Sequence, residues 1–163
     1  MSRPLAELDL ILQQMIAEHR KMLTLVDRHQ AAMKTVNLQA MDEVRNQQEA
    51  ARMRVVTLEN KRRALTQQIA KALKLTAEPR IPDLAKLDPT FGPILLKRRE
   101  ELKTIMEEVG RKSHVAGRLA GAFLGHLNTV VRVIAGAVEQ AGLYTRQGVP
   151  KVSARIGVIE AVG

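Results

Sequence analysis

The side chains best suited to catalysis or metal binding are four histidines and two pairs of adjacent glutamates. No two histidines have the four-residue spacing that places two metal ligands on one helical face. Glu100, Glu101, Glu107 and Glu108 stand among lysines and arginines, where solvated, paired carboxylates are the simplest interpretation. The sequence shows no phosphate-binding glycine loop, nucleophile elbow or dinucleotide fingerprint. We therefore expect no enzyme activity, no catalytic residue, no metal site and no cofactor. The histidines are His19, His29, His114 and His126, of which the first two fall on an apolar seam and are expected to be core or seam-edge residues.

The composition favours a single, entirely helical domain. The chain has 163 residues, 45% of them apolar and only 2% aromatic, and it has no cysteine. The lack of cysteine excludes disulfides and thiolate chemistry. With so few aromatic rings, the core must be built from aliphatic residues and methionine, which suits packed helices better than a sheet.

Two heptad seams predict a long antiparallel helical hairpin. Apolar positions step by threes and fours from Leu5 to Val36, and again from Leu38 to Ala72. We expect helices over about 5–36 and 39–75, joined by a short turn at Asn37, a residue that tolerates the left-handed conformation.

A proline-containing linker over 76–93 precedes a third predicted helix. The linker has apolar residues that are expected to pack back on the bundle, at Ile81, Leu84, Leu87 and Phe91. The third helix is expected over about 93–140. Together these elements predict a helical bundle domain over 1–141, resembling a three-helix bundle or coiled coil, followed by a flexible C-terminal tail over 142–163.

The third helix changes character halfway, from strongly charged to almost entirely apolar. The window from Val115 to Val138 is long enough to cross a bilayer, yet it contains Arg118 and Arg132, which are costly in hydrocarbon. We interpret it as a buried helix without membrane insertion. Two helices cannot cover an apolar helix on all sides, so a partner is also expected there. Gly117, Gly121 and Gly125 recur every four residues; tight packing on the first two helices is the favoured interpretation, and an adaptable docking groove is the alternative.

The charge distribution gives a nucleic-acid function little support. The net charge is +9, but it is spread along the chain: residues 1–75 carry 13 basic and 8 acidic side chains, and residues 111–163 carry 7 and 2. "NKRRAL" at 60–65 is the one dense basic cluster, and no aromatic residue stands near it to stack on bases. A basic coiled-coil protein that contacts phosphates through Arg62, Arg63, Lys151 and Arg155 remains the alternative from another class.

The order of features resembles a known family: a heptad hairpin, a proline-containing linker, an apolar third helix through "LNTVVRVIAGAVEQAGLYTRQG" and a basic tail. It is similar to the FlgN-type flagellar export chaperones. The start "MSRPLAELDL" lacks the pattern of a secretory signal, and we expect a cytoplasmic protein.

The resemblance implies two protein partners. The first is a hook-filament junction protein, whose C-terminal amphipathic helix would lie in the cytosol against the apolar half of the third helix. The implied contacts are Phe123, Leu124, Leu127, Val130, Val131, Ile134 and Val138. The second is the cytosolic domain of the export-gate protein. A chaperone of a virulence type III secretion system shares the same physics and stays open as an alternative, and the oligomeric state stays open too.

Tyr144, the sole tyrosine, follows this apolar helix. The resemblance implies that Leu143 and Tyr144 contact the export gate, and tyrosine is a common interface anchor. The alternative is a local contact at the helix end. In the tail, Val152, Ile156 and Ile159 have helical spacing and are expected to make further contacts with the bundle or a partner.

Overall fold

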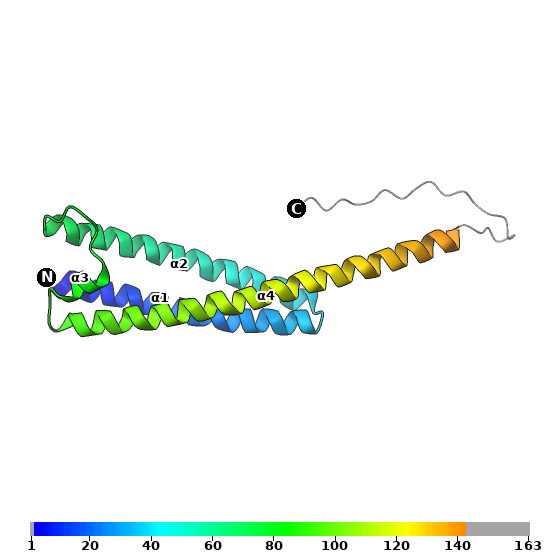
Figure 1. The fold of residues 1–163 in the computed structure, drawn as a ribbon, viewed down its shortest axis with the longest axis horizontal. Coiled ribbons are helices and arrows are strands. Elements are labelled where there is room, and N and C mark those ends of the chain that lie inside the picture. Colours follow the sequence, from blue (N-terminus) through cyan, green and yellow to red (C-terminus); the bar gives the residue numbers. More distant parts are fainter. Residues whose placement is uncertain (1, 143–163) are drawn as a thin grey trace. The chain divides into compact units, whose positions relative to one another are not determined.

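The structure is a computed structural model that describes residues 2–142, with side chains described for residues 3–137. It contains α1 (Ser2–Lys34), α2 (Leu38–Ala72), the short α3 (Ile81–Ala85) and α4 (Phe91–Gly142) (Figure 1). The described residues contain no strand, which confirms the all-α prediction. The three long helices agree with the predicted ranges to within three residues at each end, whereas α3 lies in the segment predicted as a linker.

The described residues divide into two compact units between residues 120 and 121. This division lies earlier than the predicted boundary between residues 141 and 142. The predicted tail, 142–163, lies outside the described residues apart from Gly142, so its conformation stays a prediction.

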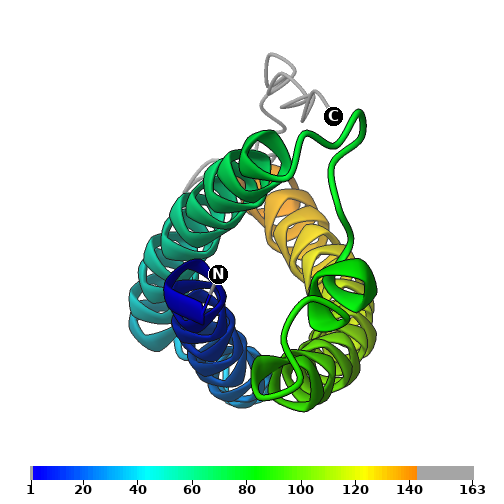
Figure 2. The same ribbon diagram turned by 90° about the vertical axis from the view of Figure 1, so that its left-hand side faces the viewer.

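Within the first unit, α1 is the helix to which both other long helices are attached. Arg54 of α2 pairs with Glu18 of α1 at 3.0 Å, between Nε and Oε2. On the other side, Arg98 Nε of α4 lies 3.0 Å from Asp9 Oδ1, and Lys112 Nζ lies 2.8 Å from Asp27 Oδ2. The proximal part of α4, residues 91–120, therefore runs in the direction of α1, and α2 runs antiparallel to it, as the hairpin prediction required (Figure 2).

The main core lies where all four helices meet. It is built from leucine, isoleucine and methionine side chains of α1 and α2, together with Leu84 of α3 and Leu95, Leu102 and Ile105 of α4. A second cluster, Leu25, Val44 and Ala51, draws on α1 and α2 alone. α4 thus contributes buried aliphatic side chains to these cores only from its first few turns.

The linker packs on this core largely as predicted. Leu84 is fully buried, and Ile81 and Phe91 pack against the core while remaining partly exposed. Leu87 is 41% exposed, so the prediction was wrong for this residue. Leu87 lies beyond the end of α3, whose backbone directs Leu84 inward instead.

The turn between α1 and α2 differs from the prediction in which residue is left-handed. Val36 has a φ of 53°, whereas Asn37 is extended and accepts a 3.0 Å hydrogen bond from the Ala40 amide through Oδ1. Asn37 is therefore the N-cap of α2. The Val36 and Asn37 amides donate to the Met33 and Ala32 carbonyls, as in a Schellman motif. The same pattern ends α2, with Lys74 at a φ of 54°.

Candidate functional site

The distal segment of α4, residues 121–142, belongs to the second unit and presents a long run of apolar side chains to solvent. Phe123 is half-buried, and every other predicted contact whose side chain is described is exposed. The exposed fractions are 60% for Leu124, 40% for Leu127, 44% for Val130, 61% for Val131 and 57% for Ile134. The Val138 side chain is not described, although its backbone lies in α4.

These positions lie on more than one side of the helix. Phe123, Leu127 and Ile134 recur at helical spacing on one face, while Leu124 and Val131 form a second row beside it. Val133 is 67% exposed and was not among the predicted contacts. The sequence could have indicated Val133. An apolar run with few polar interruptions has no single contact face, so any of its large apolar residues can be a contact.

The predicted burial of the 115–138 window is therefore wrong for the chain on its own. One helix, between Phe91 and Ala137, is long and apolar enough by length and composition to cross a membrane, and none of its apolar window is buried. The described residues of the second unit form a single helix, which has no second layer to cover it. Arg118 and Arg132 lie within this stretch, and both are costly to place in hydrocarbon. An extended exposed apolar surface is typical of a site of interaction.

Gly117, the member of the glycine repeat that lies in the first unit, does not serve close packing there. A β-carbon added to it would meet no described atom within 4 Å, apart from its own helix backbone and chain neighbours. The favoured interpretation, tight packing on the first two helices, is therefore wrong for Gly117, and at Gly121 and Gly125 it stays a prediction. The alternative, an adaptable docking surface, stays a prediction.

The predicted location of His19 is confirmed. It is 7% exposed, and its Nδ1 lies 2.8 Å from the Met15 carbonyl oxygen one turn earlier, so it is a core side chain with its polar atom engaged. His29 is half-buried, and His114 and His126 are exposed. Among the described residues, no group of three histidine or acidic side chains is arranged to hold a metal ion.

Part of the basic cluster on α2 is neutralised by one carboxylate. Glu59 accepts hydrogen bonds of 2.8 Å from Nε of both Arg62 and Arg63. The hydrogen bond from Arg62 is the main cause that lowers the pKa of Glu59 to about 2, and the same contact raises the pKa of Arg62. Glu59 offsets one of the three positive charges at Lys61, Arg62 and Arg63, so the cluster keeps a net positive charge, and contact with phosphates stays the alternative prediction.

The fold and the distal segment together define an all-helical protein whose most distinctive feature is a long, exposed apolar surface on one helix. The chain matches the family described as FlgN protein over residues 1–151. It belongs to the FlgN family of flagellar export chaperones. No curated protein and no solved structure matched it.

Several predicted contact residues lie outside the described part of the chain. These are Leu143 and Tyr144, assigned to the export gate, and the tail residues Val152, Ile156 and Ile159.

Proposed function

We propose that this protein binds the C-terminal amphipathic helix of a hook-filament junction protein along the distal segment of α4. The observation that carries the proposal is the exposure of Leu124, Leu127, Val131 and Ile134 on one helix. Burying a fully exposed side chain of this size contributes about 1.5–3 kcal/mol, so covering these roughly half-exposed side chains contributes about 1 kcal/mol each before the cost of ordering the partner. An amphipathic helix supplies the matching apolar stripe.

Binding of this kind would prevent premature assembly of the client. A junction protein's terminal helix that lies against α4 in the cytoplasm is not free to pair with other subunits. A client segment that folds on binding loses conformational entropy, which keeps the affinity moderate and allows release. The interaction draws on apolar burial alone and needs no cofactor.

Delivery would use the residues that follow the distal segment. We propose that Leu143 and Tyr144 contact the cytosolic domain of the export-gate protein, with Val152, Ile156 and Ile159 available for additional contacts. This assignment rests on the family resemblance and on the suitability of tyrosine as an interface anchor.

The direct test is calorimetric titration of the full chain with a C-terminal peptide of a hook-filament junction protein at low and high salt. Saturable binding with a negative heat-capacity change and weak salt dependence is expected, because apolar burial produces that signature. Duplex DNA and anionic lipid vesicles are the comparison ligands. DNA affinity that falls steeply with salt, without peptide binding, would instead support the basic coiled-coil protein. Vesicle binding without peptide binding would assign the distal segment to a membrane surface.

A chaperone of a virulence type III system is the remaining alternative. Terminal peptides from flagellar junction proteins and from virulence substrates, titrated in parallel, separate the two by affinity.

A further inference from the structure

The first unit contains an open groove between α2 and α4, lined by residues of this unit alone. Its floor is formed by Met22, Val26 and His29 of α1, and its volume is about 650 Å³. The α2 wall includes Arg45, Gln48, Glu49 and Arg52, and the α4 wall consists of Ser113, Ala116, Gly117 and Ala120. All of these residues lie within residues 1–120. We call this site the α2–α4 groove.

The groove exists because the side chains of α4 become small at this level. Leu95, Leu102 and Ile105 fill the space beside α1 along the first turns of α4. Beyond them, serine, alanine and glycine take the corresponding positions, and the second core cluster is completed by α1 and α2 without α4. A β-carbon on Gly117 would meet no described atom within 4 Å outside its own helix backbone and chain neighbours. The bundle therefore lacks one layer of side chains here.

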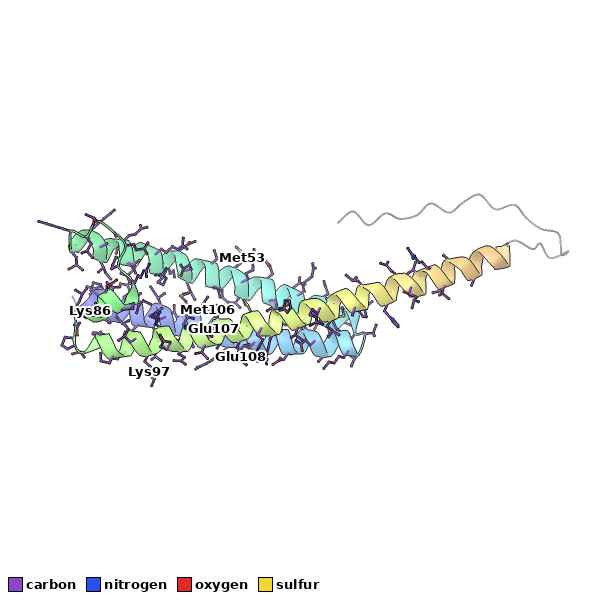
Figure 3. The ribbon with its side chains drawn as sticks, viewed as in Figure 1. Met53, Lys86, Lys97, Met106, Glu107 and Glu108 are labelled. Carbon is purple, nitrogen blue, oxygen red and sulfur yellow. The ribbon has the colours of Figure 1, made fainter. Side chains whose placement is uncertain are left out.

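No hydrogen bond or ion pair recorded for residues 3–137 joins α2 directly to α4, so the groove is not bridged by polar contacts. Met53 of α2 is 56% exposed and Met106 of α4 is 49% exposed (Figure 3). Apolar surface is thus exposed on both helices beyond the groove lining itself.

The two walls differ in charge. The α4 wall has no charged residue, whereas the α2 wall carries two arginines, Arg45 and Arg52, and one acid, Glu49. Arg45 Nη2 lies 3.0 Å from Asp42, and Arg52 Nε lies 3.7 Å from Glu49, both as solvent-exposed pairs within α2. Such pairs contribute at most about 1 kcal/mol, so these arginines can exchange partners at little cost. The first unit as a whole has 22 basic and 15 acidic residues, a net charge of +7, which favours an acidic partner.

The dimensions fit a helix. From Arg45 to Arg52 the α2 wall extends for about 10 Å at 1.5 Å per residue, which corresponds to two helical turns. Small residues on the α4 wall allow another helix axis to approach within the usual 8–10 Å. A helix placed here would stand beside α2 and α4 above α1, and would complete a four-helix arrangement.

We propose that the α2–α4 groove binds one amphipathic helix of a partner protein, with its apolar stripe on α1 and α4 and an acidic flank along Arg45 and Arg52. The proposal rests on the proposed function in taking the partner to be a client helix. It adds a second binding site, in the first unit, with its own charge preference.

The test uses two designed peptides that do not depend on the identity of the client. Each is an amphipathic helix of about 18 residues, because shorter helices are marginal in water. One has glutamates along one flank of its apolar stripe and its twin has lysines there. Binding of labelled peptide to the full chain is measured by fluorescence anisotropy. We expect the glutamate peptide to bind at least tenfold more tightly than its twin.

Gly117→Phe should then weaken binding of the glutamate peptide by tenfold or more, because the new ring occupies the groove. Gly110→Phe is the matched control: Gly110 lies in the same helix, has equally open space around its Cα and does not line the groove. Circular dichroism checks that both variants remain folded. Equal affinity for the two peptides, or wild-type binding by Gly117→Phe, overturns the proposal.

Leu127→Asp separates this inference from the proposed function. Peptide affinity lost in Leu127→Asp but kept in Gly117→Phe places the peptide on the distal segment and overturns the groove assignment alone. If a junction-protein peptide fails to bind while the glutamate peptide binds and Gly117→Phe removes that binding, the groove stands and the proposed client is wrong. A wild-type dimer that Gly117→Phe converts to monomer, seen by sedimentation velocity, overturns the choice of partner in favour of a second copy. A shortened chain that ends at residue 142 is the last comparison. If it binds the glutamate peptide tenfold more tightly than the full chain does, residues 143–163 occupy the groove, and the choice of a partner protein is overturned.

Discussion

A β-carbon placed on Gly92 would lie 2.3 Å from the carbonyl oxygen of Ala85, so the backbones of α3 and the first turn of α4 are in direct contact. This contact positions Leu84 and Leu95, both fully buried, in the same core. We expect Gly92→Ala to destabilise the protein by about 1–3 kcal/mol, because backbone atoms cannot move aside as a flexible side chain would. Urea denaturation measures the change.

Gly110→Ala is the control for this substitution. Gly110 lies in the same helix with nothing within 4 Å of an added β-carbon, apart from its own helix backbone and chain neighbours. The greater helix propensity of alanine should stabilise this variant by up to about 1 kcal/mol. If both variants are stabilised alike, α3 does not press on α4 in solution.

Val36 in the left-handed region predicts a stabilising substitution. A β-branched residue at a φ of 53° is strained, by about 1–2 kcal/mol relative to glycine, and Val36 is 57% exposed, so its side chain contributes little burial. Val36→Gly should raise the midpoint of thermal unfolding. The gain in unfolding free energy is the relieved strain minus the entropic cost of ordering glycine, which has more freedom in the unfolded chain. An unchanged or lowered midpoint would show that the α1–α2 turn does not need this conformation.

The Glu59 carboxylate predicts a pH dependence of stability. Its pKa is lowered from 4.5 to about 2, chiefly by the hydrogen bond from Arg62. A group whose pKa is lower in the folded state contributes stability above its unfolded pKa, and that contribution is lost as the pH falls from about 4.5 towards 2. After allowance for solvent screening of this partly exposed group, the loss should be about 1 kcal/mol.

Glu59→Gln tests that assignment. The variant should be less stable than the wild type at pH 7, and its unfolding free energy should fall less between pH 4.5 and 2. Glu100→Gln, which removes the carboxylate of an exposed pair with Arg99, is the matched control. Parallel profiles for Glu59→Gln and wild type would assign the acid sensitivity to other carboxylates.

The heptad seams were sufficient to predict the long helices, because each seam position on α1 from Leu5 to Met33 is buried or half-buried. The turn was predicted less well. Val36 adopts the left-handed conformation, which a β-branched residue disfavours, because hydrogen bonds from the Val36 and Asn37 amides to α1 carbonyls hold it there. The apolar distal segment was recognisable, but its burial was not predictable. Periodicity shows which side chains need covering, and it does not show whether the cover belongs to the same chain.

The α2–α4 groove was predicted only in part, through the alternative interpretation of Gly117, for a related reason. Serine, alanine and glycine on α4 allow a neighbouring helix to come close, and they leave space unfilled where no helix does so. The structure decides between these outcomes, because Met22 and Val26 line the open groove together with Ala116 and Gly117.

Ile134 and Ile105 provide a matched pair for testing the proposed client site, since both are isoleucines of α4. Ile134 is 57% exposed and Ile105 is 8% exposed within the core. Ile134→Asp should retain the helical circular dichroism signal and lose at least tenfold in affinity for the junction-protein peptide. Ile105→Asp should unfold the bundle or destabilise it by about 3 kcal/mol or more, because it buries a charge. If Ile134→Asp unfolds as well, the distal segment is part of the core and the client site is wrongly placed.

Tyr144→Ala tests whether delivery and client binding use separate residues. Tyr144 follows the distal segment, and its ring and hydroxyl suit an anchor in another protein's pocket. We expect the variant to bind the cytosolic domain of the export-gate protein at least tenfold more weakly, while its affinity for the junction-protein peptide stays within twofold of wild type. Tyr144→Phe should retain most gate binding if the ring is the anchor, and lose it if the hydroxyl is. Equal losses for gate and client in Tyr144→Ala would mean that this tyrosine belongs to the client site or to the fold, and the two-partner arrangement would then need a different contact for the gate.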